Sequence, residues 1–174
     1  DPVGTERFTV NISYNGGGTW AETFNWWGGE EMVDLDANVV QDYLYVTYVY
    51  GTPDTEARMR RFFAVDGSED TVYFWVSVFD LGVSIKEISF TTNVDSWNNR
   101  IYVWAILADA QLVVYWDDQD GISWTAYGTV ATDADFGLDA CWNEGYASVY
   151  HVFSYVSITG RLKIGMRSSG GWTF

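Results

Sequence analysis

The sequence predicts an all-β protein, and two of its features indicate this class. Long runs such as residues 43–50 and 101–107 are rich in β-branched and aromatic side chains, which is typical of strands covered on both faces. Clusters of glycine, asparagine and aspartate separate these runs, as turns between strands require. Helix signals are confined to residues 84–88, which suffice for one turn at most.

A repeated order of strands extends the prediction from class to architecture. Apolar and aromatic strands are expected at residues 44–49, 101–106 and 147–152. Each is followed by another strand, at residues 59–65, 112–116 and 162–166, and then by an aromatic strand, at residues 71–79, 124–130 and 172–174. A less regular strand precedes each group, near residues 32–36, 88–92 and 136–140. The repeat of about fifty residues is the length of one four-stranded propeller blade.

We therefore predict a propeller-like array of four-stranded blades, with a β-sandwich as the alternative fold. The chain, residues 1–174, is expected to form one domain. It divides into a partial blade at 1–30 and blades at 31–82, 83–131 and 132–174, or about three and a half blades. An open array exposes apolar sheet faces and strand edges. We therefore expect self-association, or continuation of the array in a longer chain.

The clearest local motif is a tight turn at residues 13–20. Its glycines permit positive φ, and Asn15 is expected to bond backbone amides of the turn, while the Trp20 ring is expected to pack against the next sheet. Residues 117–124 align with it without a gap, and residues 167–172 and 65–68 are shorter versions. The aligned positions are Ser13, Asn15, Gly17, Thr19 and Trp20 in the first copy, and Gly121, Ser123 and Trp124 in the second.

The pattern Ser13-x-Asn15-x-Gly17-x-Thr19-Trp20 resembles the Asp-box, or BNR, repeat of sialidase-like β-propellers, with Asn in place of Asp. That family places the box in the hairpin between the third and fourth strands of a blade. The resemblance, with the strand repeats, covers most of the chain and implies a propeller fold. In the family the box is structural, so the resemblance does not by itself imply catalysis.

Charge and composition limit the partners. The net charge of −15 disfavours nucleic acids and anionic membranes, because nucleic-acid binding depends on cations that neutralise phosphates. The longest apolar run, residues 101–108, is too short to span a bilayer. Cys141 is the single cysteine, so an intrachain disulfide is impossible. The start at residues 1–4 suits a processed N-terminus, and we expect an extracellular or cell-surface protein.

Aspartate pairs make calcium the candidate cofactor. Oxygen-bearing side chains two positions apart occur in Asp34, Asp36 and Asn38, in Asp118 and Asp120, and in Asp133 and Asp135. Calcium loops use this spacing to bring carboxylates around one ion. The alternative is that these are ordinary acidic turns of an acidic chain.

Exposed tryptophans are the candidates for glycan binding, because sugars stack on aromatic rings beside polar groups. Two segments that we expect to be loops carry Trp26 and Trp27, and Trp97 and Arg100. The alternative is that these tryptophans pack between blades.

A hydrolase of the resembled family would carry an arginine cluster, a Tyr–Glu nucleophile pair and an acidic residue as acid/base. Arg58, Arg60 and Arg61 form the only such cluster, with Arg58 and Arg60 on one strand face and Arg61 on the other. We expect these arginines to pair with carboxylates, and the single histidine, His151, to pack within a sheet.

Three functions are consistent with these features. The first is a non-enzymatic β-repeat module for adhesion, surface architecture or self-assembly. The second is a lectin-like propeller that binds carbohydrate, and the third is a sialidase-like glycoside hydrolase. No catalytic constellation is visible in the sequence, so the first is preferred.

Overall fold

A computed structural model describes residues 7–13, 15–27, 32–50, 54–73, 76–94, 99–117, 123–143, 149–168 and 171–174. The described chain consists of β-strands and one three-residue 3₁₀ turn, η1 (Thr71–Tyr73), so the predicted all-β class is confirmed. Residues 85–88 lie in an extended strand and form no helical turn.

The strands form four antiparallel sheets, and none of the sheets is closed. Sheet 1 contains β1 (Arg7–Ile12) and β2 (Ala21–Trp27). Sheet 2 contains β3 (Met32–Val40), β4 (Tyr43–Tyr50), β5 (Glu56–Phe63) and β6 (Val76–Asp80). Sheet 3 contains β7 (Ile85–Val94), β8 (Asn99–Leu107), β9 (Leu112–Asp117) and β10 (Thr125–Ala131). Sheet 4 contains β11 (Ala134–Trp142), β12 (Val149–Ser157), β13 (Leu162–Ser168) and β14 (Gly171–Thr173).

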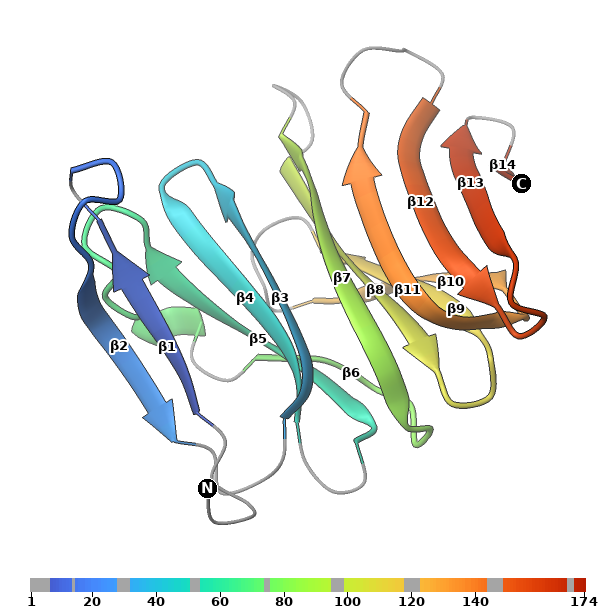
Figure 1. Ribbon diagram of the computed structural model, residues 1–174, viewed down its shortest axis with the longest axis horizontal. Coiled ribbons are helices and arrows are strands. Elements are labelled where there is room, and N and C mark those ends of the chain that lie inside the picture. The colour runs from blue at the N-terminus through green and yellow to red at the C-terminus, as the bar shows by residue number, and fades with distance from the viewer. Residues whose placement is uncertain are drawn as a thin grey trace.

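The sheets follow one another along the molecule in chain order. Within each sheet, neighbouring strands are also consecutive in the sequence. The first strands of sheets 2, 3 and 4, which are β3, β7 and β11, contact one another in turn, and sheets 1 and 4 lie at opposite ends of the array (Figure 1). The less regular strands expected near residues 32–36, 88–92 and 136–140 lie within these three first strands.

Successive sheets bury an apolar core between them. Val10 of sheet 1 packs with Tyr48 and Phe62 of sheet 2. The sheet 2 residues Tyr45 and Met59 face the sheet 3 residues Ile101, Val103 and Leu107. A third core joins sheet 3 to sheet 4 and contains Trp104, Ile106, Leu112, Phe153 and Tyr155. Each of sheets 2 and 3 is therefore covered on both faces, which explains why β4 and β8 are apolar and aromatic at nearly every position.

Backbone hydrogen bonds in two hairpins set the register of the repeat. Leu107 donates its N–H to the Gln111 carbonyl at 2.8 Å, and Ser157 donates to the Arg161 carbonyl at 2.9 Å. Residues 107 and 157 are therefore equivalent, so residues 101–106 correspond to 151–156. The strand expected at residues 147–152 overlaps β12, which extends five residues further, to Ser157.

Candidate functional site

The contact between first strands is built from carboxylates. Asp34 Oδ2 and Asp36 Oδ2 on β3 accept the backbone N–H groups of Ile88 and Phe90 on β7, at 2.8 and 2.7 Å. These donors lie on the edge of sheet 3, where a strand otherwise leaves its amides unpaired. The carboxylates therefore provide hydrogen-bond acceptors for backbone N–H groups at the edge of the next sheet.

A carboxylate also accepts a backbone N–H between β7 and β11. Sequence reasoning did not predict this contact. Glu87 Oε2 accepts the Leu138 N–H at 2.8 Å, and Lys86 pairs with Asp135 at 2.7 Å. A shallow hollow of about 490 Å³ lies over these strands, and it is lined by Asp34, Asp36, Lys86, Glu87 and Asp139, among others. Burial raises the pKa of Asp34, and the N–H groups of Ile88 and Leu35 offset part of that effect.

The calcium candidates on β3 already have backbone partners. Asp34 Oδ1 accepts the Leu35 N–H and Asp36 Oδ1 accepts the Ala37 N–H, so both oxygens of each carboxylate are hydrogen-bonded. Asn38 is exposed on the same strand.

The other calcium candidates are either paired or not described. Asp133 pairs with Lys163 and Asp135 with Lys86, while Asp118 and Asp120 lie outside the described residues. In the part of the chain that the structure describes, no three His, Cys, Asp or Glu side chains form a group that could hold a metal ion. Calcium binding stays a prediction, which titration of chelator-treated protein with Ca²⁺ would test.

The turn at residues 13–20 connects β1 and β2 and is held by its own side chains. Asn15 Oδ1 accepts the Thr19 N–H at 2.8 Å, Asn15 Nδ2 donates to Thr19 Oγ1 at 2.9 Å, and Gly17 N donates to Ser13 Oγ at 2.8 Å. Gly17 has a φ of 90°, which explains the requirement for glycine. Asn15 therefore bonds a backbone amide of the turn as predicted.

The tryptophans of the two turn copies lie in different environments. Trp20 is 66% exposed, and its ring lies beside Gly17 of its own turn. The expectation that Trp20 packs against the next sheet is therefore wrong, because the ring covers the turn instead. Trp124 is half-buried against the core between sheets 2 and 3. Ser123 precedes it in the connection between β9 and β10, and Gly121 lies outside the described residues.

The glycan candidates that the structure describes lie on two different sheets. Trp26 and Trp27 end strand β2 and do not lie in a loop as expected. Arg100 lies in β8, with its guanidinium 4.0 Å from the centre of the Trp116 ring. Trp97 lies outside the described residues. Glycan binding by these residues stays a prediction.

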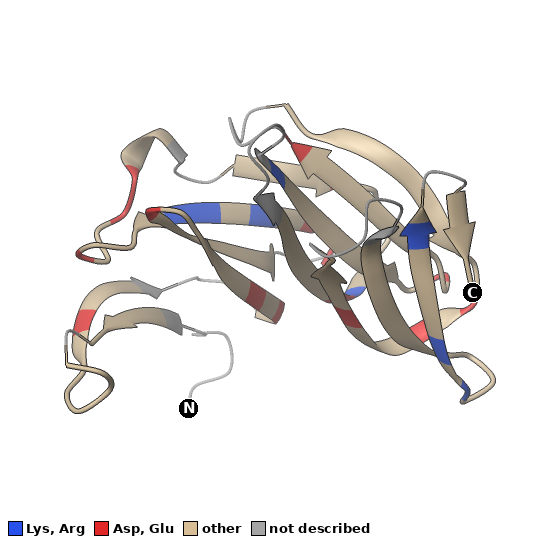
Figure 2. Ribbon diagram, turned by 90° about the horizontal axis from the view of Figure 1, so that it is seen from above, with Lys and Arg blue, Asp and Glu red and all other residues tan. Residues whose placement is uncertain are grey.

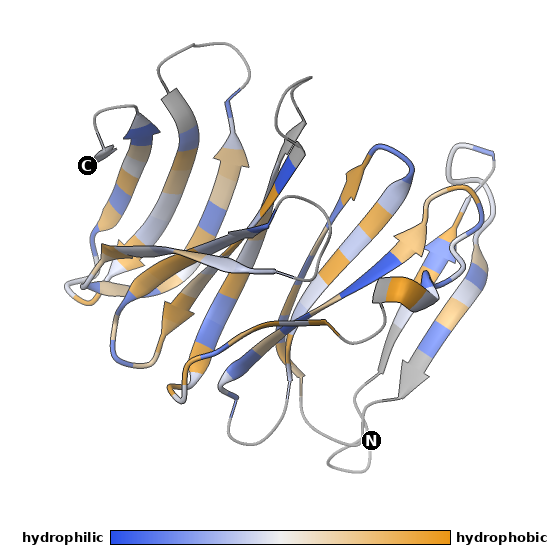
Figure 3. Cartoon of the chain, turned by 180° about the vertical axis from the view of Figure 1, so that it is seen from behind, coloured by the Kyte–Doolittle hydropathy of each residue, from blue (hydrophilic) through white to orange (hydrophobic). Residues whose placement is uncertain are grey.

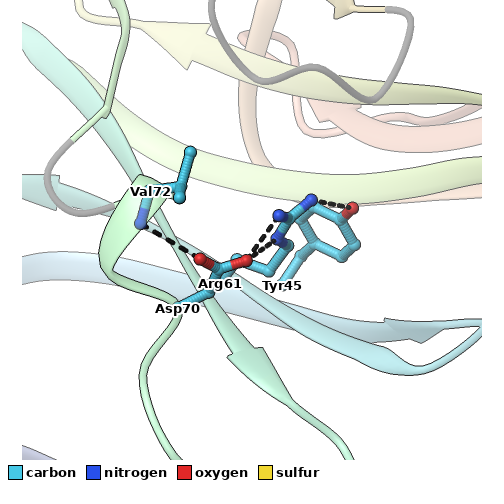
Figure 4. A network of polar contacts seen from close by, with 4 residues as sticks. All are labelled: Tyr45, Arg61, Asp70 and Val72. Carbon is cyan, nitrogen blue, oxygen red and sulfur yellow. Dashed lines mark hydrogen bonds and ion pairs between the residues drawn. The ribbon is translucent and has the colours of Figure 1, made fainter.

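Each arginine of the cluster on β5 has a carboxylate partner. Arg58 pairs with Glu56 at 2.6 Å and Arg60 with Glu69 at 2.7 Å. Arg61 Nε donates to Asp70 at 2.9 Å on the opposite face, where Tyr45 and the Val72 N–H complete the network (Figure 4). The expected pairing and the expected division between two faces are both confirmed.

His151 is buried on β12, on the face of sheet 4 that packs against sheet 3, so the expected packing of this histidine in a sheet is confirmed. Its ring makes edge contacts with Tyr102, Trp104 and Trp142, and its Nδ1 is buried without a hydrogen-bond partner in the described protein. Burial, with a smaller contribution from Arg167, lowers the pKa of His151 to about 4. His151 is therefore neutral at pH 7.

Sequence reasoning expected exposed apolar sheet faces in an open array but did not locate them, and the structure places one such face on sheet 4. In sheets 1 to 3, we call the side turned toward the next sheet in chain order the forward face. In sheet 4, the forward face is the side that carries the equivalent residues. In sheet 3 this face carries Tyr102, Trp104, Ile106, Leu112, Val114 and Trp116, which pack on sheet 4. The equivalent residues of sheet 4 are Val152, Ser154, Val156, Leu162, Ile164 and Met166.

No described sheet covers the forward face of sheet 4. Leu162, Ile164 and Met166 are 67%, 59% and 44% exposed, and Phe136, paired with Val156 on the same face, is 51% exposed. Apolar and polar bands alternate along β13 in Figure 3. Because side chains alternate between the faces of a strand, Lys163 and Arg167 lie on the other face, with Tyr155 and His151. The alternation of residues 162–166 was the available signal, but it does not by itself indicate which face is covered.

The fold and these sites define an all-β protein of four stacked antiparallel sheets, joined by apolar cores and by carboxylates on their first strands. No protein-family model matches the chain, and no curated protein is similar to it. The charged residues are spread over several strands in the view of Figure 2. The described residues include no helix long and apolar enough to cross a bilayer.

Proposed function

We propose that this chain is a non-enzymatic β-repeat module that assembles with copies of itself, and that its four sheets are blades of a propeller-like array. The observation that carries the proposal is the forward face of sheet 4, which is apolar and exposed where the same face of sheet 3 is buried. Exposed apolar patches of this kind mark interaction surfaces.

The propeller-like architecture is supported by the strand order and by the contacts between first strands. Sheets 2, 3 and 4 each have four strands in chain order, with β3, β7 and β11 placed side by side. The turn resembling an Asp-box connects β1 to β2, and its second copy connects the third and fourth strands of sheet 3. This position agrees with the resemblance to sialidase-like propellers.

A structural role for the charged groups supports a non-enzymatic module. Asp34, Asp36 and Glu87 bond backbone amides of the neighbouring sheet, and the arginines on β5 bond carboxylates. The polar atoms of these side chains stabilise the contacts between strands. Carbohydrate binding, hydrolase activity and an extracellular or cell-surface location stay predictions from the sequence.

The native mass in solution tests this proposal. Light scattering after size exclusion should give a mass above that of one chain, and Ile164→Lys should return the mass to that of one chain because the lysine places a charge on the apolar face. Val72→Lys is the matched control, since Val72 is 74% exposed on η1, away from sheet 4. A wild-type protein that is monomeric at all concentrations would contradict the proposal.

A further inference from the structure

We propose that the forward face of sheet 4 binds the forward face of sheet 4 in a second copy, so that the dimer has two-fold symmetry. This inference rests on the proposed function and specifies its partner and geometry. Three properties of the described residues favour this arrangement: the composition of the face, its size, and the polarity of the opposite end of the molecule.

The forward face of sheet 4 is nearly free of charge. It carries Val152, Val156, Leu162, Ile164, Met166 and Phe136, with Ser154 and Cys141 among them. Among the described residues, Asp139 is the one charged side chain on this face, and it lies on β11 at the edge of the sheet. The chain has a net charge of −15, so two copies repel each other over most of their surfaces. An uncharged apolar face is where they can approach.

The opposite end of the array does not match this apolar face. On the side of sheet 1 turned away from sheet 2, the described side chains include those of Thr9, Asn11, Glu22 and Asn25, which are paired across β1 and β2. Their side chains are hydrogen-bonded to each other, with Asn11 donating to Thr9 and Asn25 to Glu22, both at 3.1 Å. Head-to-tail contact would remove these polar side chains from water and place them against apolar groups, which is unfavourable. Face-to-face contact places apolar side chains on apolar side chains.

The size of the face fits a weak dimer. Its three long strands have seven to nine residues. At about 3.3 Å per residue and about 4.8 Å between strands, these strands present roughly 400 Å². Two such faces bury roughly 800 Å², which lies in the range of weak, transient associations. We therefore expect a dimer that dissociates on dilution.

The register of sheet 4 places one residue near the proposed two-fold axis. Ser154 and Ile164 are paired on the two central strands, β12 and β13, and occupy the middle row of the face. In a two-fold contact, residues near the axis meet their own counterparts in the other copy. Ile164 of one copy should therefore lie close to Ile164 of the other copy.

Charge reversal at Ile164 tests this geometry. Ile164→Lys and Ile164→Glu should each be monomeric, and an equal mixture should recover the dimer mass, because lysine from one copy then faces glutamate from the other. Ile164 is 59% exposed, so both variants should keep the wild-type melting temperature and circular dichroism spectrum. The control mixture is Val72→Lys with Val72→Glu, each of which should dimerise like the wild type, alone and mixed.

Three other outcomes would each contradict a different part of the proposal. A wild type that never dimerises overturns both the proposed assembly and its geometry. A dimer that survives both Ile164 substitutions shows that copies associate through another surface. Monomeric variants that stay monomeric when mixed show that the face binds a different surface of the second copy, which refutes two-fold symmetry but leaves assembly through sheet 4 intact.

Discussion

Asp36 and Phe90 join two sheets that share no strand: the Asp36 carboxylate on β3 accepts the Phe90 backbone N–H on β7 at 2.7 Å. Asp36 Oδ1 also accepts the Ala37 N–H, so one side chain satisfies an amide in each of two neighbouring strands. Such bonds join the first strands of sheets 2 and 3, β3 and β7, beside the apolar core.

The first prediction concerns this link. Asp36→Ala leaves the Phe90 N–H without its acceptor, and we expect the free energy of unfolding to fall by about 1–3 kcal/mol. Urea denaturation at pH 7 measures the change. Asn38→Ala is the control on the same strand, because Asn38 is exposed. Equal losses in the two variants would show that the bond to Phe90 contributes nothing.

The second prediction concerns the tight contact between Gly165 and Phe153. A methyl group built on Gly165 would lie 2.2 Å from Phe153 Cζ, so Gly165→Ala forces the ring to move within the core between sheets 3 and 4. We expect a loss of about 1–3 kcal/mol in the free energy of unfolding. In a Phe153→Leu background the same substitution should cost less, since the ring is absent. An unchanged cost there would mean that the strain has another origin.

The third prediction is a pH dependence due to His151. Its folded-state pKa of about 4 lies below the ordinary value of 6.5, so the unfolded chain binds a proton at higher pH than the folded protein does. This group therefore favours folding above pH 6.5, and its contribution falls as the pH drops from about 6.5 to about 4. The loss is on the order of 3 kcal/mol.

Comparison with His151→Phe isolates this effect. The phenylalanine ring suits the aromatic contacts with Tyr102 and Trp142 but does not titrate. Both proteins have the same carboxylates. The change in unfolding free energy between pH 7 and pH 4 should therefore differ between them only by the contribution of His151. Parallel stability curves for the two proteins would show that the His151 pKa is not lowered.

The fourth prediction concerns the turn at residues 13–20. Asn15→Ala removes the acceptor of the Thr19 N–H and the donor to Thr19 Oγ1, and should cost about 1 kcal/mol. Asn15→Asp keeps the acceptor, and the Thr19 hydroxyl can donate to the new carboxylate, so its stability should stay near that of the wild type. Thermal melts of the three proteins test this. A costly aspartate would argue against the likeness to an Asp-box.

Much of the fold could be predicted because its signals are local. The β-branched and aromatic composition of residues 43–50 and 101–107 corresponds to β4 and β8, and the carboxamide of Asn15 bonds within its own turn. The strand expected at residues 147–152 ended too early, because β12 extends to Ser157 before the turn at Gly160 reverses the chain.

The candidate sites were harder to predict because they depend on which strands become neighbours. The spacing of Asp34 and Asp36 suggested a metal site, whereas the structure places their oxygens against amides of a strand distant in sequence. Trp20 was expected to pack on a sheet, but its ring covers its own turn. Sequence spacing shows which side chains share a face of a strand, but not which sheet or loop packs against that face.

The sequence by itself determined most of the strands and turns and the repeated order of units, since hydrophobic alternation and turn chemistry act over a few residues. The strand expected at residues 71–79 is an exception, because Thr71–Tyr73 form η1. Only the tertiary structure decided which apolar faces are buried. Trp104 and Ile164 both lie on forward faces, yet Trp104 is fully buried by sheet 4 and Ile164 is exposed. The difference arises from the stacking of whole sheets, which the residues of a single strand do not encode.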